Sequence, residues 1–274
     1  MESLLDKLNE TTAFLAAAGI VSPNVGVVLG TGLGELAHHI EIEKTIPYHQ
    51  IPNFPVSTVE FHKGNLLWGR IGTTSVLAMQ GRFHYYEGHS MQQITFPIRV
   101  MKLLGVKQLL LSNAAGGMNL QFKKGDLVIL TDHINTQTDN PLSGHTHEAF
   151  GTRFPDMSCP YNQPLSELLY TEAAKLGTPM HRGIYVAVNG PNLETRAEYK
   201  YLKAAGADMV GMSTVPEVIV ANQVGLPCAA VSVITDECDP DNLQPVEISE
   251  IIAVAGKADK KLSQIFAEVI RQLS

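Results

Sequence analysis

One short segment of the chain concentrates groups that could do chemistry. Residues 81–89, Gly-Arg-Phe-His-Tyr-Tyr-Glu-Gly-His, contain one permanent cation, two imidazoles, two phenols and a carboxylate. Extended backbone would place Arg82, His84 and Tyr86 on one side of the chain, and the arginine fork matches the oxygens of a phosphate. The segment therefore predicts an anion-binding strand end, although an exposed hairpin end with a stacked arginine would have the same composition.

A glycine-rich turn could bind an anion in a similar way. Gly30-Thr31-Gly32-Leu33-Gly34 follows the apolar stretch 25–29 and precedes a predicted helix from Glu35. Glycines let backbone N–H groups converge on an anion, and the Thr31 hydroxyl adds a donor. The segment matches neither G-x-G-x-x-G nor a P-loop. It predicts either a phosphate-binding loop or a tight strand-to-helix turn.

Small residues and one further hydroxyl extend this set of possible ligand contacts. The segment 112–117, Ser-Asn-Ala-Ala-Gly-Gly, ends a short apolar strand and would let a ligand approach the backbone closely. Ser213 precedes a predicted helix capped by Thr214, with Glu217 as an acidic residue in its first turn, so Ser213 could bind an anion or join the cap. His62 stands alone in a predicted strand, which favours a structural role.

Two carboxylates stand apart from these donors. Glu194 ends the turn 190–193 and could be an ordinary acidic residue in the first turn of a helix. Asp236 is one of three acidic residues at a predicted strand end, which fits a solvated acidic turn, a cation site or a ligand contact. The spacing differs from that of an EF-hand loop, and His145-x-His147 lacks a third ligand, so no metal site is predicted.

The elements that must position these residues alternate along the chain. Apolar strands are predicted at residues 25–29, 58–68, 74–80, 109–111, 127–130, 184–188 and 231–235, and helices at about 4–18, 95–104, 163–176, 195–205, 215–224 and 247–272. This alternation predicts an α/β fold, in which ligands bind at the carboxyl ends of the strands. The polar stretch 132–164 is predicted as a long functional loop. Together these features indicate a substrate with an anionic part and a polar ring.

The composition limits the class of function. The 274 residues fit one large or two small domains, and no shift in composition marks a boundary. Twenty basic and 27 acidic residues, a net charge of −7, argue against a nucleic-acid or anionic-membrane surface. Three cysteines without CxxC spacing suit a reducing compartment. The absence of G-x-S-x-G argues against a serine hydrolase. Without a signal peptide or a long apolar run, we expect a soluble cytoplasmic protein.

Taken in order, the motifs resemble those of the trimeric purine nucleoside phosphorylases that act on 6-oxopurine nucleosides. The segments that carry the resemblance are 28–34, 80–88, 112–117, 153–158, 190–195 and 211–217, and it extends over about residues 20–265. It implies one α/β domain over residues 1–274, with a central distorted mixed sheet flanked by helices, and a homotrimer. It also implies phosphorolysis, in which a purine nucleoside and inorganic phosphate, the co-substrate, give the base and α-ribose 1-phosphate without a metal or organic cofactor.

The resemblance also implies roles for single residues. Phosphate contacts would come from Thr31, His62, Arg82, His84, the backbone of Ala114, and Ser213. Ribose contacts would come from Tyr86, Met212 and a neighbouring subunit's Phe154. Purine contacts would come from Leu193, Glu194 and Asp236, and the catalytic groups would be His84, Glu194 and Asp236. A phosphate dianion under the sugar stabilises an oxocarbenium-like transition state, and a carboxyl group at the base assists the leaving purine.

Two positions depart from the pattern of that family. The family usually has asparagine where this chain has Asp236, and an ionised carboxylate can only accept hydrogen bonds, so Asp236 would have to be protonated or use water to serve a 6-oxopurine. Related 5′-methylthioadenosine phosphorylases have aspartate there but lack the glutamate that Glu194 matches. The family's histidine for the ribose 5′-hydroxyl has no counterpart, because His181 is the last histidine, so the region 247–250 must supply another group or leave that end open.

These features favour inosine, guanosine and their deoxy analogues as substrates. Adenosine or 5′-methylthioadenosine phosphorolysis is the alternative within the same class, because Asp236 could serve a 6-amino group. A nucleoside or phosphate binder without catalytic activity is the alternative from a different class.

Overall fold

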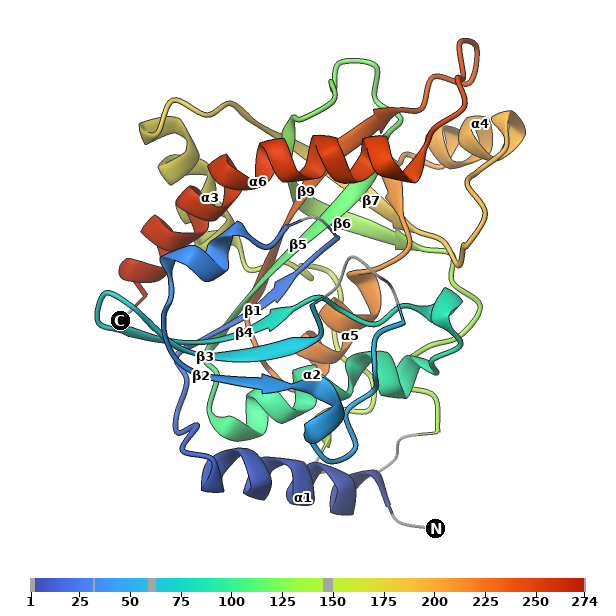
Figure 1. Ribbon diagram of the computed structural model, residues 1–274. Helices are drawn as coiled ribbons and strands as arrows, with labels where there is room; N and C mark the ends of the chain where they lie inside the picture. The colour runs from blue at the N-terminus through green and yellow to red at the C-terminus, as the bar shows by residue number, and fades with distance from the viewer. Residues whose placement is uncertain (1–2, 32, 59–62, 145–149, 274) are drawn as a thin grey trace.

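The structure is a computed structural model that describes residues 3–31, 33–58, 63–144 and 150–273 (Figure 1). The described residues form a mixed sheet with the strand order β2-β3-β4-β1-β5-β8-β7-β6-β9. The strands are β1 (Val25–Leu29), β2 (Glu41–Pro47), β3 (Asn65–Ile71), β4 (Thr74–Gln80), β5 (Gln108–Gly117), β6 (Leu127–Asn135), β7 (Met180–Ala187), β8 (Met209–Gly211) and β9 (Cys228–Glu237).

The sheet is distorted because β9 pairs with two strands that lie apart in the strand order. It runs parallel to β5 along almost its whole length and antiparallel to β6 at Val231–Val233. The strands β5, β8, β7, β6 and β9 therefore close on themselves, while β1, β4, β3 and β2 extend from β5 as an open sheet. The predicted α/β fold with a distorted mixed sheet is confirmed.

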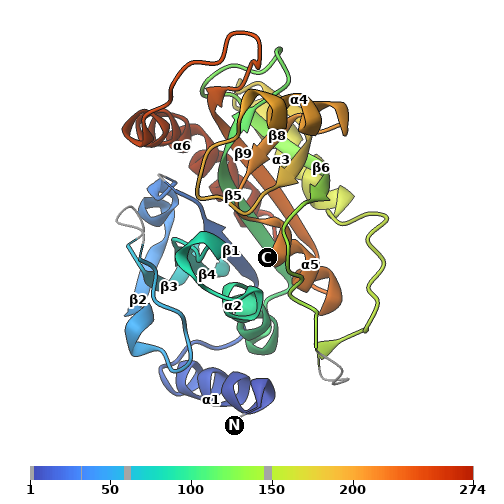
Figure 2. The ribbon, with the colours of Figure 1, turned by 90° about the vertical axis from the view of Figure 1, so that its right-hand side faces the viewer.

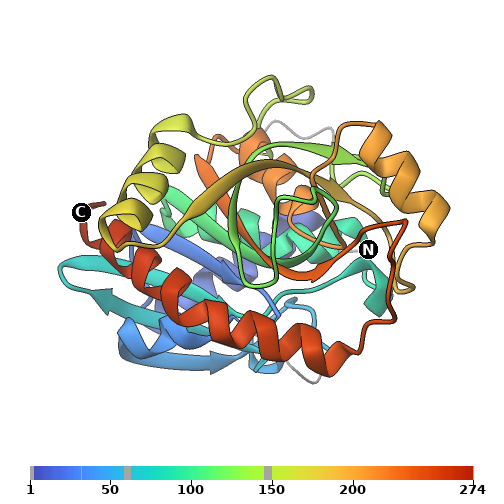
Figure 3. The ribbon, with the colours of Figure 1, turned by 90° about the horizontal axis from the view of Figure 1, so that it is seen from above.

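Helices cover both faces of this sheet. They are α1 (Leu4–Ala17), α2 (Met91–Leu104), α3 (Gln163–Lys175), α4 (Arg196–Ala204), α5 (Val215–Gln223) and α6 (Ile248–Arg271). Helices α1, α2 and α5 share one apolar cluster, α3 and α6 share a second, and α4 packs in a small third cluster with β7 and β8. Helices α6 and α1 lie on opposite sides of the molecule (Figure 2), and the view from above shows α6 running along its side (Figure 3). None of the helices in the described parts of the chain could span a membrane.

Some predicted boundaries were wrong for identifiable reasons. Strand β2 escaped prediction because it is a largely exposed edge strand without apolar alternation, and β8 because it is only three residues long. The helix expected from Glu35 is a short 3₁₀ helix, η1 (Glu35–His39). Helix α2 begins at Met91, earlier than expected, because Ser90 and Gln93 form a capping box. The predicted strand 58–68 is β3, which begins at Asn65.

Four adjacent strands share one direction, so their carboxyl ends meet at one edge of the sheet. Strands β4, β1, β5 and β9 are parallel, and the register sets Leu29 beside Gln80 and Val28 beside Leu111. The turn after β1 therefore lies beside the segment after β4 and the second half of β5. Gly30 allows this approach, because a Cβ there would lie 2.7 Å from the Ser112 carbonyl oxygen.

Candidate active site

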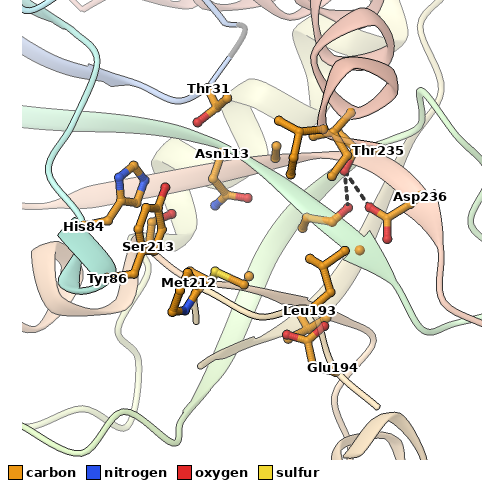
Figure 4. A pocket seen from close by; sticks show the side chains of 18 of the residues that line it. Thr31, His84, Tyr86, Asn113, Leu193, Glu194, Met212, Ser213, Thr235 and Asp236 are labelled. Carbon is orange, nitrogen blue, oxygen red and sulfur yellow. Dashed lines mark hydrogen bonds between the residues drawn. The ribbon is translucent and has the colours of Figure 1, made fainter. Parts of the chain in front are cut away.

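A cavity of about 310 Å³ opens at this edge of the sheet (Figure 4). Its walls come from the strand ends of β5 and β9, the turns after β1, β4 and β8, and the first turns of α4 and α6. Most of the site residues predicted from the sequence line it, namely Thr31, Arg82, His84, Tyr86, Ala114, Leu193, Glu194, Met212, Ser213 and Asp236. Segments far apart in the sequence, from Thr31 to Ile251, thus form one site. We call the part around Arg82 the phosphate end and the part around Asp236 the purine end.

The phosphate end is built on a buried ion pair. The Arg82 Nε donates to the Glu217 Oε1 at 3.0 Å, and both side chains are almost completely buried. One terminal nitrogen of Arg82 donates to the Ser112 carbonyl oxygen at 2.7 Å and lies 3.3 Å from the Ser213 hydroxyl. These contacts fix the guanidinium against the cavity wall. The interpretation of Glu217 as an ordinary first-turn acid was incomplete, because its carboxylate is the partner of Arg82.

The turn that carries Ser213 has a strained backbone. Thr214 has a φ of 70°, which is unfavourable for a β-branched residue. Its hydroxyl makes no helix cap, contrary to the prediction, but accepts a hydrogen bond from the Asn113 side chain at 2.9 Å. Asn113 is held in turn by the Ser232 hydroxyl at 2.6 Å. The strand pair β5–β9 therefore holds Ser213 and the N-terminus of α5 in place beside Arg82.

His84 is oriented by a neighbouring carboxylate. Burial acts to raise the pKa of Glu87, but hydrogen bonds from His84 and Thr58 outweigh burial and lower that pKa to about 2. Glu87 is therefore ionised and can only accept hydrogen bonds. In the 2.9 Å contact, the N–H at His84 Nδ1 must then donate to Glu87 Oε1. Burial lowers the pKa of His84 despite this carboxylate, which favours the neutral imidazole. The neutral ring then presents Nε2 as an acceptor.

The loop that carries Thr31 is anchored from α6. The Asp259 carboxylate accepts the Glu35 backbone N–H at 2.6 Å and the Ser263 hydroxyl at 2.8 Å, and it also accepts the Gly34 backbone N–H. Burial raises the pKa of Asp259, and these hydrogen bonds oppose that effect. A carboxylate from the far end of the chain thus ties down the glycine-rich turn.

At the purine end, two carboxyl groups lie close together. Asp236 is buried, and its oxygens accept from the Thr235 hydroxyl at 2.8 Å and from the Cys238 thiol at 3.1 Å. Glu194 lies on the opposite wall, just before α4 (Figure 4). Burial raises the pKa of Glu194, a hydrogen bond from Tyr199 opposes this, and the negative charge of Asp236 adds to the rise. The purine end therefore combines acceptors with groups that can carry a proton.

Between the two ends lie an aromatic ring and two apolar side chains. The Tyr86 ring stacks on His84 at 4.7 Å with an interplanar angle of 13°. Burial, assisted by the Glu87 charge, raises the pKa of Tyr86 to about 12, so its phenol stays protonated. Met212 and Leu193 supply apolar surface to the cavity wall. A flat polar ligand with an anionic end fits these walls.

Two predicted site residues are not found in this cavity. Phe154 is 84% exposed and lines a separate surface cavity. His62 lies outside the described residues. In the region expected to replace the missing histidine, α6 brings Ile248 and Ile251 to the cavity. No group of three or more potential metal ligands gathers within the part of the chain that the structure describes.

Several residues of the site gave no usable signal in the sequence. Glu217 contacts Arg82 only because distant segments meet in the fold. Tyr199 follows Glu194 by five residues and lies within the predicted helix 195–205. Cys238 and Glu87 lie two and three residues from Asp236 and His84, so only these two could have been found from local spacing.

Comparison with known proteins supports the geometry. The sequence profile described as "Phosphorylase superfamily" matches residues 24–271. The chain is 46% identical over 267 residues to purine nucleoside phosphorylase 1 of Bacillus subtilis, covering 97% of this chain and 98% of that protein. It is 43% identical over 271 residues to the purine nucleoside phosphorylase of Mus musculus, covering 96% and 93%. The structure superposes on a Schistosoma purine nucleoside phosphorylase in complex with hypoxanthine with a TM-score of 0.94, at 39% identity and full coverage of both chains.

Proposed function

Because the chain belongs to the phosphorylase superfamily, within its purine nucleoside phosphorylases, we propose that its cavity binds inorganic phosphate at one end and a 6-oxopurine nucleoside at the other. The reaction is the phosphorolysis of purine nucleosides. The preferred substrates are inosine, guanosine and their deoxy analogues. The observation that carries this proposal is the single cavity that joins the Arg82 cluster to Glu194 and Asp236.

Phosphate binds at the phosphate end through complementary donors and one acceptor. The Arg82 guanidinium, the hydroxyls of Thr31 and Ser213, and the backbone at Ala114 surround the same part of the cavity. The N-terminus of α5 adds a favourable dipole. Hydrogen phosphate carries one P–OH, and the neutral His84 ring accepts its proton at Nε2. The remaining phosphate oxygens then accept hydrogen bonds from the donors. One acceptor and several donors match the single P–OH of the phosphate dianion.

The bound dianion acts on the sugar. Breaking the C1′–N9 bond builds positive charge on the ribose, as in an oxocarbenium ion. A phosphate fixed beneath C1′ stabilises this charge and is already placed to form the new C–O bond. Tyr86 and Met212 contact the ribose between the two ends of the cavity. The electron pair of the broken bond passes to the purine.

The purine end receives this electron density. The ionised Glu194 accepts the N1–H of a 6-oxopurine, and Leu193 packs against the ring. Asp236 donates a proton toward the O6 and N7 edge in its protonated form, because an ionised carboxylate has nothing to donate. Proton transfer to N7 lets the base leave as a neutral molecule. His84, Glu194 and Asp236 are therefore the proposed catalytic residues.

The enzyme acts as a cytoplasmic homotrimer in this proposal. Phe154 is 84% exposed beside the Arg153 guanidinium, which lies 5.5 Å from the ring centre. Such an exposed aromatic side chain is typical of an interface. In the trimer, Phe154 reaches the ribose pocket of the neighbouring subunit. Its exposure in a single chain supports this role.

A second candidate function is the phosphorolysis of 5′-methylthioadenosine or adenosine. It is favoured by the apolar Ile248 and Ile251, which line the cavity from the first turn of α6. An apolar wall suits a methylthio group better than a 5′-hydroxyl. Asp236 could also accept a hydrogen bond from a 6-amino group. Against this candidate, Glu194 can accept the N1–H that only a 6-oxopurine presents, which favours inosine and guanosine.

One assay tests both candidates. Hypoxanthine release from inosine is measured with and without phosphate, and kcat/KM is compared for inosine, adenosine and 5′-methylthioadenosine. We expect phosphate-dependent turnover with inosine preferred. Equal rates with and without phosphate would identify a hydrolase, and preference for methylthioadenosine would select the second candidate. Binding of inosine without turnover would identify a nucleoside binder.

A further inference from the structure

The side of the cavity that α6 forms is apolar. Ile248 and Ile251 are the residues of this helix that line the cavity, and we call them the α6 wall. They stand three positions apart in the first turns, so they lie on one face of the helix. Ile248 is 51% exposed, and Ile251 is partly buried. A large apolar side chain that is exposed to solvent and also lines a cavity is typical of a surface that a ligand covers.

The polar segment before this helix is tied to α4 instead of the cavity. Arg196 of α4 donates to the Pro240 carbonyl oxygen at 3.0 Å, and Lys200 of α4 pairs with Asp241 at 2.9 Å. None of residues 239–247, all of which the structure describes, lines the cavity. A ligand that reaches this side of the cavity therefore meets two isoleucine side chains and no hydroxyl, amide or charged group from the segment.

The shape of a nucleoside directs its 5′ group to the α6 wall. In the proposed binding mode, phosphate lies under one face of the sugar, and the base and C5′ both project from the other face. Glu194 and Asp236 hold the base, and Tyr86 and Met212 contact the ribose. The wall that remains for C5′ is the first turn of α6, because the other lining residues lie on or next to the elements that hold phosphate and purine.

We propose that the cavity also takes 6-oxopurine nucleosides whose 5′-hydroxyl is replaced by an alkylthio group, such as 5′-methylthioinosine. This inference rests on the proposed function, whose purine end is unchanged, with Glu194 accepting N1–H and Asp236 at the O6 and N7 edge. The α6 wall receives the alkylthio group. The substrate class thus joins the base of one candidate function to the sugar of the other.

The order of substrates follows from what each 5′ group gains at an apolar wall. A hydroxyl gains no hydrogen-bond partner from the α6 wall, and it loses water wherever the isoleucines cover it. A methylthio group has no such loss, and its methyl and sulfur gain apolar contact. A site that hydrogen-bonds the hydroxyl would instead reject a substrate that lacks it. The two kinds of 5′ site therefore predict opposite orders of substrate.

The reaction at C1′ is the same for this substrate class. The C1′–N9 bond breaks and its electron pair leaves with the purine, while a phosphate oxygen forms the new bond to C1′. The proton that hydrogen phosphate loses balances the proton that the purine gains, so no further reactant is needed. The C5′–S bond stays intact. The products are hypoxanthine and 5-methylthioribose 1-phosphate.

The test crosses two bases with two 5′ groups. At saturating phosphate, kcat/KM is measured for inosine, 5′-methylthioinosine, adenosine and 5′-methylthioadenosine. We expect 5′-methylthioinosine to be cleaved at least as efficiently as inosine and more efficiently than 5′-methylthioadenosine. A kcat/KM for 5′-methylthioinosine clearly below that for inosine would overturn the inference. A preference for 5′-methylthioadenosine over 5′-methylthioinosine would also overturn it.

A substitution in the α6 wall tests whether the isoleucines cause this order. Ile248→Asn places an amide that can bond a 5′-hydroxyl and that a methylthio group leaves unpaired. We expect the ratio of kcat/KM for 5′-methylthioinosine to that for inosine to fall at least about tenfold. Ile252→Asn is the matched control, because Ile252 is also partly buried on α6 but does not line the cavity, and it should leave the ratio unchanged. Equal ratios in Ile248→Asn and the wild type would overturn the role of the α6 wall.

Two further measurements separate this inference from other causes. Thermal unfolding midpoints show whether both variants fold like the wild type. Phosphate-dependent turnover of inosine without turnover of 5′-methylthioinosine would overturn the inference and leave the proposed function intact. A wild type that cleaves neither nucleoside in a phosphate-dependent reaction would instead overturn the proposed function, and this inference with it.

Discussion

The two ends of the cavity recognise their ligands by different physical means. At the phosphate end, Arg82 is paired with Glu217 and His84 with Glu87, in contacts of 3.0 and 2.9 Å. These groups have fixed hydrogen-bond partners. At the purine end, Asp236 accepts hydrogen bonds from Thr235 and Cys238, and Glu194 lies on the opposite wall, where burial raises its pKa. In the proposed reaction, the phosphate end would therefore set the affinity for every substrate, whereas the purine end would set the choice between substrates.

The largest expected effect comes from removing the fixed charge at the phosphate end. Arg82→Met should lower kcat/KM at least about a thousandfold for inosine and adenosine alike, because the dianion loses its main counter-charge. It should also destabilise the fold by about 3–5 kcal/mol, because Glu217 remains buried and unpaired. Steady-state kinetics and thermal unfolding measure the two effects.

A second variant separates binding from folding. Arg82→Met combined with Glu217→Gln removes both charges and should regain most of the lost stability, while phosphorolysis stays absent. If this double variant regained activity, Arg82 would have only a structural role. The contrast between the two ends would then be wrong, because the phosphate end would work without its cation.

The next largest effect is expected at the purine end and should depend on the substrate. Glu194→Ala should cost about 3 kcal/mol of transition-state binding for inosine, roughly a hundredfold in kcat/KM, because N1–H loses its acceptor. The loss for 6-amino analogues such as adenosine, which lack N1–H, should be much smaller. Kinetics with inosine and adenosine measure the difference. Turnover of inosine near the wild-type rate would remove Glu194 from base recognition.

The contrast between the ends also explains what could be predicted from the sequence. Groups at the phosphate end lie on contiguous motifs at strand ends, such as residues 81–89, and their residue types alone indicate anion binding. The strand–helix alternation likewise predicted the fold class. Local patterns do not report contacts between distant segments, so the partnership of Glu217 with Arg82, 135 residues away, had no signal.

At the purine end, the residue types of Tyr199 and Cys238 did not indicate that these side chains belong to the site. Tyr199 has the sequence signature of a helix core residue, and Cys238 that of an isolated thiol. Both are indeed buried in an apolar cluster, yet their polar atoms reach the site. Burial and chemistry coincide there because residues of α4, β7 and β8 and Cys238, just after β9, pack in one apolar cluster. That packing depends on the short strand β8, which has too few residues to be predicted from its pattern.

A smaller effect should show whether the hydrogen-bond donor at position 236 sets the choice between inosine and adenosine. Asp236→Asn fixes a donor at the O6 and N7 edge, so the ratio of kcat/KM for inosine to that for adenosine should rise about tenfold. The KM for phosphate should not change, because the phosphate end is untouched. Thr235→Val serves as the control for the 2.8 Å contact to Asp236 and should not raise this ratio. An unchanged ratio in Asp236→Asn would show that Asp236 has no part in specificity.

The smallest expected effect tests whether the phosphate end depends on its anchor in α6. Asp259→Ala leaves the backbone N–H groups of Glu35 and Gly34 without their acceptor, so the loop that carries Thr31 should loosen. We expect the KM for phosphate to rise about fivefold and kcat at saturating phosphate to change less than about twofold. Glu172→Ala removes another buried carboxylate, one that pairs with Lys175 away from the cavity, and should affect stability alone. An equal rise in KM for inosine would mean that α6 holds the whole cavity together rather than its phosphate end.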